Sequence, residues 1–344
     1  MIGRIIVMAV TDVGIDLGTS SILVYVRGRG VVLKEPSIAA FDRDEEKIRA
    51  IGEEARIQLS RAAGNLTQIQ PLENGIIADY VVTEQMLRYF IQKAVGRLSF
   101  RKPRVCICIP VGLTQVERHA VEDAAYQAGA RDAHVVEEPI AAAIGAGIDF
   151  SKPCGNMIVD IGGGSTNVAI LSMDGIVVST HVKVGGNDYD EAIIRYVRNQ
   201  FGVVIERAAA EEIKMHVGTV YERPEERFLE FIGRDIETGL PKKVRISSED
   251  CRLACRELTG RVVEAVHSVL EKTPPELASD VVSRGIVLVG GGCLIDGLEE
   301  LLESRTGVNV VTADDPLCAV AIGTVLFRDT PFERTSSKKI KRHY

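Results

Sequence analysis

Two aspartates occupy equivalent places in two similar stretches of the sequence. Asp16 and Asp160, which are 144 positions apart, each follow an apolar run and precede a turn rich in glycine and hydroxyl residues. A carboxylate at the end of a buried strand is costly unless it is hydrogen-bonded or lies near a cation. Mg²⁺ that keeps several waters would fit two such carboxylates together with phosphate oxygens. The pair therefore predicts a magnesium site, the alternative being that each aspartate caps its own turn.

Three glycine-rich turns follow apolar runs, at residues 14–21, 160–166 and 290–292. Backbone N–H groups in such turns can converge on phosphate oxygens, because glycine lets the backbone approach closely. Each turn alone could be an ordinary turn, but three together favour a phosphate site. The sequence contains no Walker A loop, and no G-x-G-x-x-G follows the first strand. We therefore expect backbone amides and a metal ion to hold the phosphates. Hydroxyl donors would come from Thr19, Ser20, Ser21, Ser165 and Thr166.

A pair of glutamates, Glu137 and Glu138, lies between an apolar run and a helix that begins at Pro139. A carboxylate at such a strand end could orient the water that attacks a γ-phosphate. The alternative is a carboxylate that only favours the N-terminus of the helix through its dipole.

The elements that must position these residues alternate between strands and helices. The apolar runs on either side of the first turn, within residues 13–27, predict a β-hairpin. Residues 156–170 repeat the same order of apolar run, aspartate, glycine turn and apolar run. Thr114 and Glu117 have the spacing of a capping box for a helix that Gly129 ends. Residues 188–201 predict an amphipathic helix, and Ser247 or Ser248 is expected to cap a long one. This alternation predicts mainly parallel sheets covered by helices on both faces.

The composition is that of a globular protein and limits the class of partner. The chain has 344 residues, which favours two domains. Its net charge of −7 argues against a nucleic-acid-binding protein. Its seven cysteines form no C-x-x-C pair, so buried, reduced thiols are expected. No apolar stretch reaches the length of about 20 residues that spans a bilayer, and residues 1–10 lack a secretory cleavage site, so a cytoplasmic protein is expected.

Taken together, these motifs resemble those of the ATPase superfamily of actin, heat-shock chaperones and sugar kinases. The motifs are residues 16–19, 138–145, 160–166 and 290–292. Other stretches resemble, more specifically, the MreB-type bacterial actins that determine rod shape: residues 71–80, 233–241, 271–278 and 313–317. The resemblance covers roughly residues 13–326.

The resemblance implies a fold and an activity. The fold is α/β, with duplicated actin-like (ribonuclease H-like) domains, mixed sheets flanked by helices and a central nucleotide cleft. Domain I would comprise residues 1–148 and 325–344 with an insert at about 33–68, and domain II residues 149–324 with an insert at about 182–246. The implied protein is a slow ATP hydrolase that uses ATP and Mg²⁺. Its homopolymeric filaments would direct cell-wall synthesis and rod shape.

The resemblance also assigns roles to single residues. Asp16 and Asp160 would hold Mg²⁺ directly or through water, and Glu138 would position the attacking water, assisted by Ser165. Glu211 and Lys214 match the residues that touch ribose, although their spacing on a helix also allows an ion pair between them. The nucleotide-binding residues implied are Gly18, Thr19, Ser20, Ser21, Gly162, Gly163, Gly164, Ser165, Gly185, Gly186, Asn187, Glu211, Lys214, Gly290, Gly291 and Gly292.

Residues 96–103 occupy the position of the family's membrane loop. Leu98 and Phe100, flanked by Arg97, Arg101 and Lys102, suit the surface of an acidic bilayer. An ordinary loop is the alternative. The resemblance implies peripheral association with the inner face of the cytoplasmic membrane, contact with cell-wall elongation proteins, and no nucleic acid. Residues 1–10 could form a second anchor.

Two other functions in the superfamily compete with a filament. A small-molecule kinase needs a catalytic base for a substrate hydroxyl, and we find no clear candidate in the sequence; phosphate release with and without sugars would separate the two. A chaperone-type ATPase needs a peptide-binding domain, and none is expected after Leu326.

Overall fold

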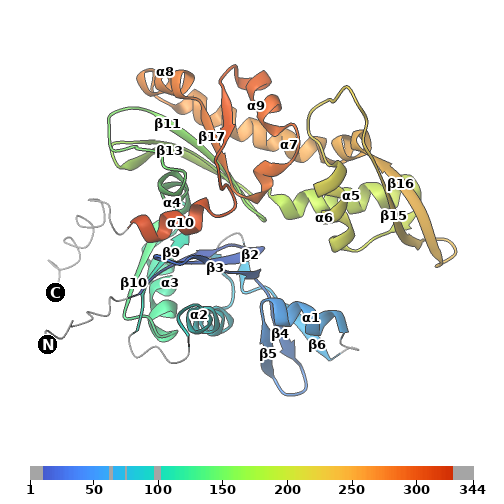
Figure 1. The fold of residues 1–344 in the computed structure, drawn as a ribbon, viewed down its shortest axis with the longest axis horizontal. Helices are drawn as coiled ribbons and strands as arrows, with labels where there is room; N and C mark the ends of the chain where they lie inside the picture. Colours follow the sequence, from blue (N-terminus) through green and yellow to red (C-terminus); the bar gives the residue numbers. More distant parts are fainter. Residues whose placement is uncertain (1–10, 62–64, 74–75, 97–101, 328–344) are drawn as a thin grey trace, which may run out of the picture. The chain divides into compact units, whose positions relative to one another are not determined.

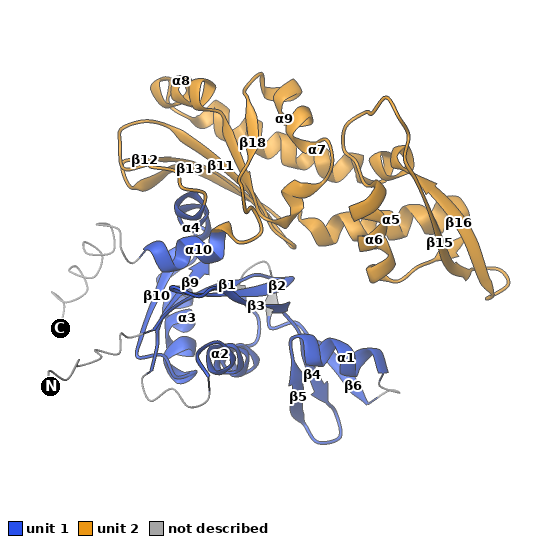
Figure 2. Ribbon diagram, in the orientation of Figure 1, with its two compact units in different colours: residues 1–145, 320–344 blue, residues 146–319 orange. Residues whose placement is uncertain are grey.

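The computed structural model describes residues 11–61, 65–73, 76–96 and 102–327. The chain divides into two compact units, one made of residues 1–145 and 320–344 and the other of residues 146–319 (Figure 2). Leu98 and Phe100, together with residues 1–10, lie outside the described residues. Among the residues that are described, no helix is long and apolar enough to cross a membrane.

The first unit is built on a five-stranded mixed sheet in the order β10-β9-β1-β2-β3. Three consecutive strands are antiparallel: β1 (Asp12–Leu17), β2 (Ser21–Val26) and β3 (Gly30–Pro36). β9 (Arg104–Ile109) runs parallel to β1, and β10 (Asp132–Glu137) runs parallel to β9. The expected first hairpin is confirmed as β1 and β2.

Helices cover both faces of this sheet (Figure 1). One face packs on α2 (Tyr80–Val95) and α3 (Gln115–Gln127), and Ile15 shares the buried cluster there with Phe90. The other face carries α4 (Glu138–Gly145) and α10 (Ala319–Leu326). A Cβ atom at Gly14 would lie 2.1 Å from the Thr324 hydroxyl of α10, so glycine lets β1 and α10 approach. The predicted capping box of Thr114 and Glu117 at the start of α3 is confirmed.

A smaller group of elements is inserted between β3 and α2. It contains a three-stranded antiparallel sheet in the order β5-β4-β6. Its members are β4 (Ala39–Asp42), β5 (Lys47–Ile51), α1 (Glu53–Arg61) and β6 (Leu66–Ile69), followed by the short pair β7 (Leu72–Glu73) and β8 (Ile76–Ile77).

The second unit repeats the strand plan of the first. Its sheet has the order β13-β12-β11-β17-β18, again three antiparallel strands followed by two parallel ones. The strands are β11 (Asn156–Ile161), β12 (Thr166–Ser172), β13 (Gly175–Val182), β17 (Ile286–Val289) and β18 (Val310–Thr312).

The two hairpins also share their register. Asp16 lies opposite Leu23 in the first, and Asp160 lies opposite Asn167 in the second, so each aspartate faces the residue seven positions later. Each aspartate is the last but one residue of its strand. The duplication expected from the sequence is therefore confirmed at the level of strand order and register.

Helices cover the sheet of the second unit. They are α5 (Gly186–Phe201), α7 (Ser248–Lys272), α8 (Pro275–Arg284), α9 (Leu298–Thr306) and the 3₁₀ helix η1 (Gly291–Leu294). Ser247 caps α7 in a capping box, one of the two positions expected. α5 ends at Gly202, whose φ of +64° is left-handed and suits glycine.

The second unit also carries an insertion, seen with α5 in Figure 1. It comprises β14 (Val203–Val204), α6 (Arg207–Val217), β15 (Phe228–Asp235) and β16 (Pro241–Ser247), with strand order β14-β15-β16.

All seven cysteines of the chain are free, and five of them are buried, as expected.

Candidate functional site

The first unit places Asp16 at the mouth of the β1–β2 turn, where it is hydrogen-bonded by a thiol. Cys108 on the neighbouring strand β9 donates from Sγ to Asp16 Oδ1 over 3.1 Å. Burial raises the pKa of Asp16 to about 6, and the thiol hydrogen bond opposes that rise only in part. A Cβ atom at Gly18 would lie 2.6 Å from the Ser21 carbonyl oxygen, so this tight turn requires glycine. The turn thus holds a carboxylate whose negative charge is poorly compensated by other groups of the unit.

The two glutamates at the start of α4 have different surroundings. Glu137 forms an ion pair with Arg118 of α3. Glu138 lies near the buried Cys108 thiol: burial raises the pKa of Cys108, and the Asp16 and Glu138 carboxylates raise it further. The structure therefore brings Asp16 and Glu138 to the same end of β9. Arg118 neutralises the negative charge of Glu137.

Three glycine segments of the second unit meet at the end of β11. The Gly162 amide donates to the Ser165 carbonyl over 2.8 Å and closes the β11–β12 turn. The Gly186 amide donates to the Gly162 carbonyl over 3.0 Å, so the start of α5 is attached to that turn. A Cβ atom at Gly185 would lie 2.6 Å from the Gly163 carbonyl. The predicted second phosphate turn and the segment 185–187 are therefore direct neighbours.

The third glycine segment packs against the same aspartate. A Cβ atom at Gly290 would lie 2.5 Å from Asp160 Oδ1, and one at Gly292 would lie 2.3 Å from the Ile161 side chain. The Cys293 thiol donates to the Gly290 carbonyl, and its pKa is raised to about 12, mainly by burial and further by Asp160. Asp160, itself buried, is thus packed against the backbone of Gly290.

Lys214 is held in place by groups other than Glu211, with which its helical spacing also allowed an ion pair. Its Nζ lies 2.6 Å from Asp190 Oδ1 and donates to the Gly186 carbonyl over 2.8 Å. Lys214 therefore reaches from α6 to the first turn of α5, beside the glycine turn. Glu211, one turn earlier on α6, is exposed. The predicted hydroxyl donor Thr166 is also engaged elsewhere, because it donates to the Val184 carbonyl over 2.7 Å.

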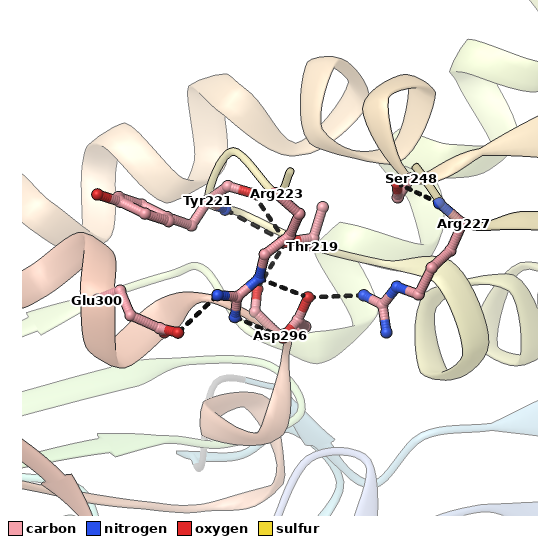
Figure 3. A network of polar contacts seen from close by, with 7 residues as sticks. All are labelled: Thr219, Tyr221, Arg223, Arg227, Ser248, Asp296 and Glu300. Carbon is pink, nitrogen blue, oxygen red and sulfur yellow. Dashed lines mark hydrogen bonds and ion pairs between the residues drawn. The ribbon is translucent and has the colours of Figure 1, made fainter. Parts of the chain in front are cut away.

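A network of charges fixes the segment that follows the third glycine turn (Figure 3). Asp296 accepts two hydrogen bonds from Arg223, and Arg227 donates to it over 2.6 Å. Arg223 also donates to Glu300 over 2.7 Å, while Thr219 donates to the Asp296 carbonyl over 3.1 Å. These two arginines connect the insertion to Asp296, which follows residues 290–292 in the sequence.

The chemistry of these groups fits phosphate and a magnesium ion. Among the described residues, no cluster of three or more histidine, cysteine, aspartate or glutamate side chains could by itself hold a metal ion. A cation beside Asp16 or Asp160 would therefore take most of its ligands from phosphate and water, as Mg²⁺ commonly does. Asp16, whose charged form is disfavoured by burial, would gain from such a cation.

Sequence reasoning missed two residues at these turns. Cys108 was interpreted only as a buried thiol, although the carboxyl ends of parallel β9 and β1 must meet at one edge of the sheet. Asp190 was passed over within an amphipathic helix. It lies three and seven residues before the buried Ile193 and Val197, so an acid on the apolar face was the available signal.

The sequence and the fold are similar to those of characterised proteins. A profile of the family described as "MreB/Mbl protein" matches residues 10–335. The chain is 47% identical over 318 residues to cell shape-determining protein MreB of Escherichia coli K12, covering 91% of each chain. It is 43% identical over 322 residues to cell shape-determining protein Mbl of Bacillus subtilis 168, covering 94% of this chain and 97% of the relative.

Solved structures of similar fold include a nucleotide complex and a filament. The crystal structure of Spiroplasma citri MreB5 bound to AMPPNP superposes with a TM-score of 0.87 at 34% identity, covering 98% of this chain and 99% of that one. The MamK double helical filament superposes with a TM-score of 0.78 over 94% of this chain and 99% of that one. At 21% identity, the MamK likeness shows the actin-like fold alone.

Proposed function

Since the chain belongs to the MreB/Mbl protein family, we propose that it is an actin-like cytoskeletal ATPase that assembles into filaments. One observation carries the nucleotide part of this proposal. The same hairpin, with an aspartate in the same register and a glycine turn after it, occurs once in each unit. The relative bound to AMPPNP has this fold at 34% identity, which supports ATP as the ligand.

The resemblance implies the residues that would contact the nucleotide. Backbone amides of residues 18–21 and 162–165 would contact phosphate oxygens, and residues 290–292 would pass beside the adenosine. Asp16 and Asp160 would hold Mg²⁺, which supplies positive charge against the phosphates when it is bound. Glu211 and Lys214 would reach the ribose.

Glu138 is the residue that would orient the attacking water. It begins α4 at the end of β10, and it shares the end of β9 with Asp16. Glu137 forms an ion pair with Arg118, and the resemblance assigns the water-orienting role to Glu138. Ser165 would assist from the turn of the second unit. These are positioning roles, as hydrolysis of a phosphoanhydride largely requires.

Substitution of each glutamate tests this assignment. We expect Glu138→Gln to lower the rate of phosphate release at saturating Mg-ATP by about tenfold or more, because a neutral amide accepts a weaker hydrogen bond from the attacking water than a carboxylate does. ATP affinity should change by less than about threefold. Glu137→Gln is the matched control, since it removes one charge next door and should leave the rate within about threefold. Equal rates for the two variants would contradict the assignment.

We also propose that the filaments lie on the inner face of the cytoplasmic membrane and direct cell-wall synthesis and rod shape. Two relatives at 43% and 47% identity are named for determining cell shape. The membrane contact would be Leu98 and Phe100, which are flanked by Arg97, Arg101 and Lys102. Two apolar side chains contribute only a few kcal/mol, about 1.5–3 each. Stable binding would therefore come from the many copies in one filament.

A further inference from the structure

Asp190 is a buried acid that the proposed mechanism does not use. It lies on α5 with only 2% of its surface exposed, next to the buried Tyr189 and one turn before the buried Ile193. Burying a carboxylate costs several kcal/mol unless partners compensate for lost water. Burial raises the pKa of Asp190, and the Lys214 ammonium beside it is the group that most opposes the rise. A residue kept at such a cost calls for an explanation beyond packing.

Its partners both come from α6. Lys214 Nζ lies 2.6 Å from Asp190 Oδ1, and Arg207 Nε lies 3.7 Å from Asp190 Oδ2. The Lys214 side chain is 17% exposed, whereas that of Arg207 is 44% exposed and the more distant of the two. Lys214 is therefore the partner that matters. Replacing a buried ion pair by apolar residues is often neutral or stabilising, so stability alone does not account for this one.

The Lys214 ammonium links Asp190 to the second glycine turn. An ammonium has three N–H donors. Lys214 donates one of them to the Gly186 carbonyl over 2.8 Å and forms an ion pair with Asp190, whose Oδ1 lies 2.6 Å from Nζ. Gly186 in turn donates its amide to the Gly162 carbonyl over 3.0 Å. The ammonium can donate further hydrogen bonds, and its side chain is partly exposed beside the turn.

We propose that Asp190 is a positioning residue, which holds the Lys214 ammonium against Gly186 so that a further N–H of the ammonium is aimed at the ribose hydroxyls of the nucleotide. This inference rests on the proposed function, because it needs ATP as the ligand. Asp190 itself does not touch the nucleotide. Its effect passes through Lys214, so removing either residue costs the same contact.

The test compares ATP with 2′,3′-dideoxy-ATP, which lacks both ribose hydroxyls. Equilibrium binding of each nucleotide with Mg²⁺ is measured for the parent chain, Asp190→Asn, Lys214→Gln and the double variant. Glu191→Gln, an exposed carboxylate one residue further along α5, is the matched control. Thermal unfolding of each protein checks that it is folded, and phosphate release is measured at saturating ATP.

We expect each single variant to weaken ATP binding about tenfold and dideoxy-ATP binding by no more than about threefold. The double variant should bind ATP about as well as Lys214→Gln, because both changes remove one contact. Glu191→Gln should match the parent chain in binding and in the rate at saturating ATP. If Asp190→Asn does not fold, Asp190→Ser is measured in its place, with the same selective loss of ATP binding expected.

Two results would overturn the inference while leaving the proposed function intact. One is equal weakening of both nucleotides by the single variants. The other is an additive loss of about a hundredfold in the double variant, which would mean that Asp190 and Lys214 act independently. A parent chain that binds no ATP would overturn the proposed function, and this inference with it.

Discussion

Asp16 carries a charge that the first unit disfavours when no cation is bound. Its pKa in the folded protein, about 6, is above the ordinary 3.8 because of burial. The folded protein therefore favours the protonated form of Asp16. The stability that the protein has while Asp16 is protonated is complete below about pH 4 and is lost as the pH rises through 6.

Replacing Asp16 by asparagine should stabilise the nucleotide-free, magnesium-free protein. The rise in the pKa of Asp16 from 3.8 to about 6 corresponds to a gain of roughly 3 kcal/mol in the free energy of unfolding at pH 8, since one pKa unit is about 1.4 kcal/mol. The advantage of Asp16→Asn should shrink towards pH 4. Denaturant unfolding at several pH values measures it, with Asp123→Asn, an exposed acid, as the control. No gain at pH 8, or a gain that does not vary with pH, would refute this.

At this scale the sequence identified residues better than their partners. Asp16, Asp160 and Glu138 stood out because carboxylates at apolar strand ends are unusual. Cys108 and Asp190 did not, because each acquires its meaning from a neighbour distant in sequence: Cys108 from Asp16, and Asp190 from Lys214. Helical spacing allowed a Glu211–Lys214 pair, whereas the fold offers Lys214 a buried acid on another helix.

At the scale of elements, local signals were sufficient where the structure is local. The two hairpins and the capping boxes at Thr114 and Ser247 are confirmed, since turn and cap chemistry is written in a few adjacent residues. The pairing of β14 with β15 and the bond from Arg223 to Asp296 were not predicted. They join residues at least thirty positions apart, and no local pattern specifies such contacts.

Residues 96–103, which precede β9 in the sequence, are the segment that should determine membrane binding. We expect filaments of the variant Leu98→Ser with Phe100→Ser to lose at least tenfold in cosedimentation with vesicles rich in phosphatidylglycerol, because the inserted apolar area is gone. Met173→Ser, which changes an apolar side chain that is 70% exposed in another turn, is the control. Double-variant filaments that bind these vesicles as well as the parent would rule out this contact.

At the scale of the whole molecule, the duplication is the main result. An offset of 144 residues between two similar motifs predicted two related domains, and the identical strand order of the two sheets confirms it. Each unit carries its own aspartate and glycine turn in the same register. The surfaces by which copies assemble were not predicted, because a subunit interface leaves no periodic signal in one sequence.

Sedimentation after addition of Mg-ATP, with electron microscopy of the pellet, tests the central claim most directly. The account predicts that the chain pellets as filaments with ATP and Mg²⁺ and remains in the supernatant without nucleotide. Phosphate release should accompany assembly. If no filaments form with any nucleotide, in the presence or absence of acidic lipid, the chain is not the filament-forming ATPase proposed here.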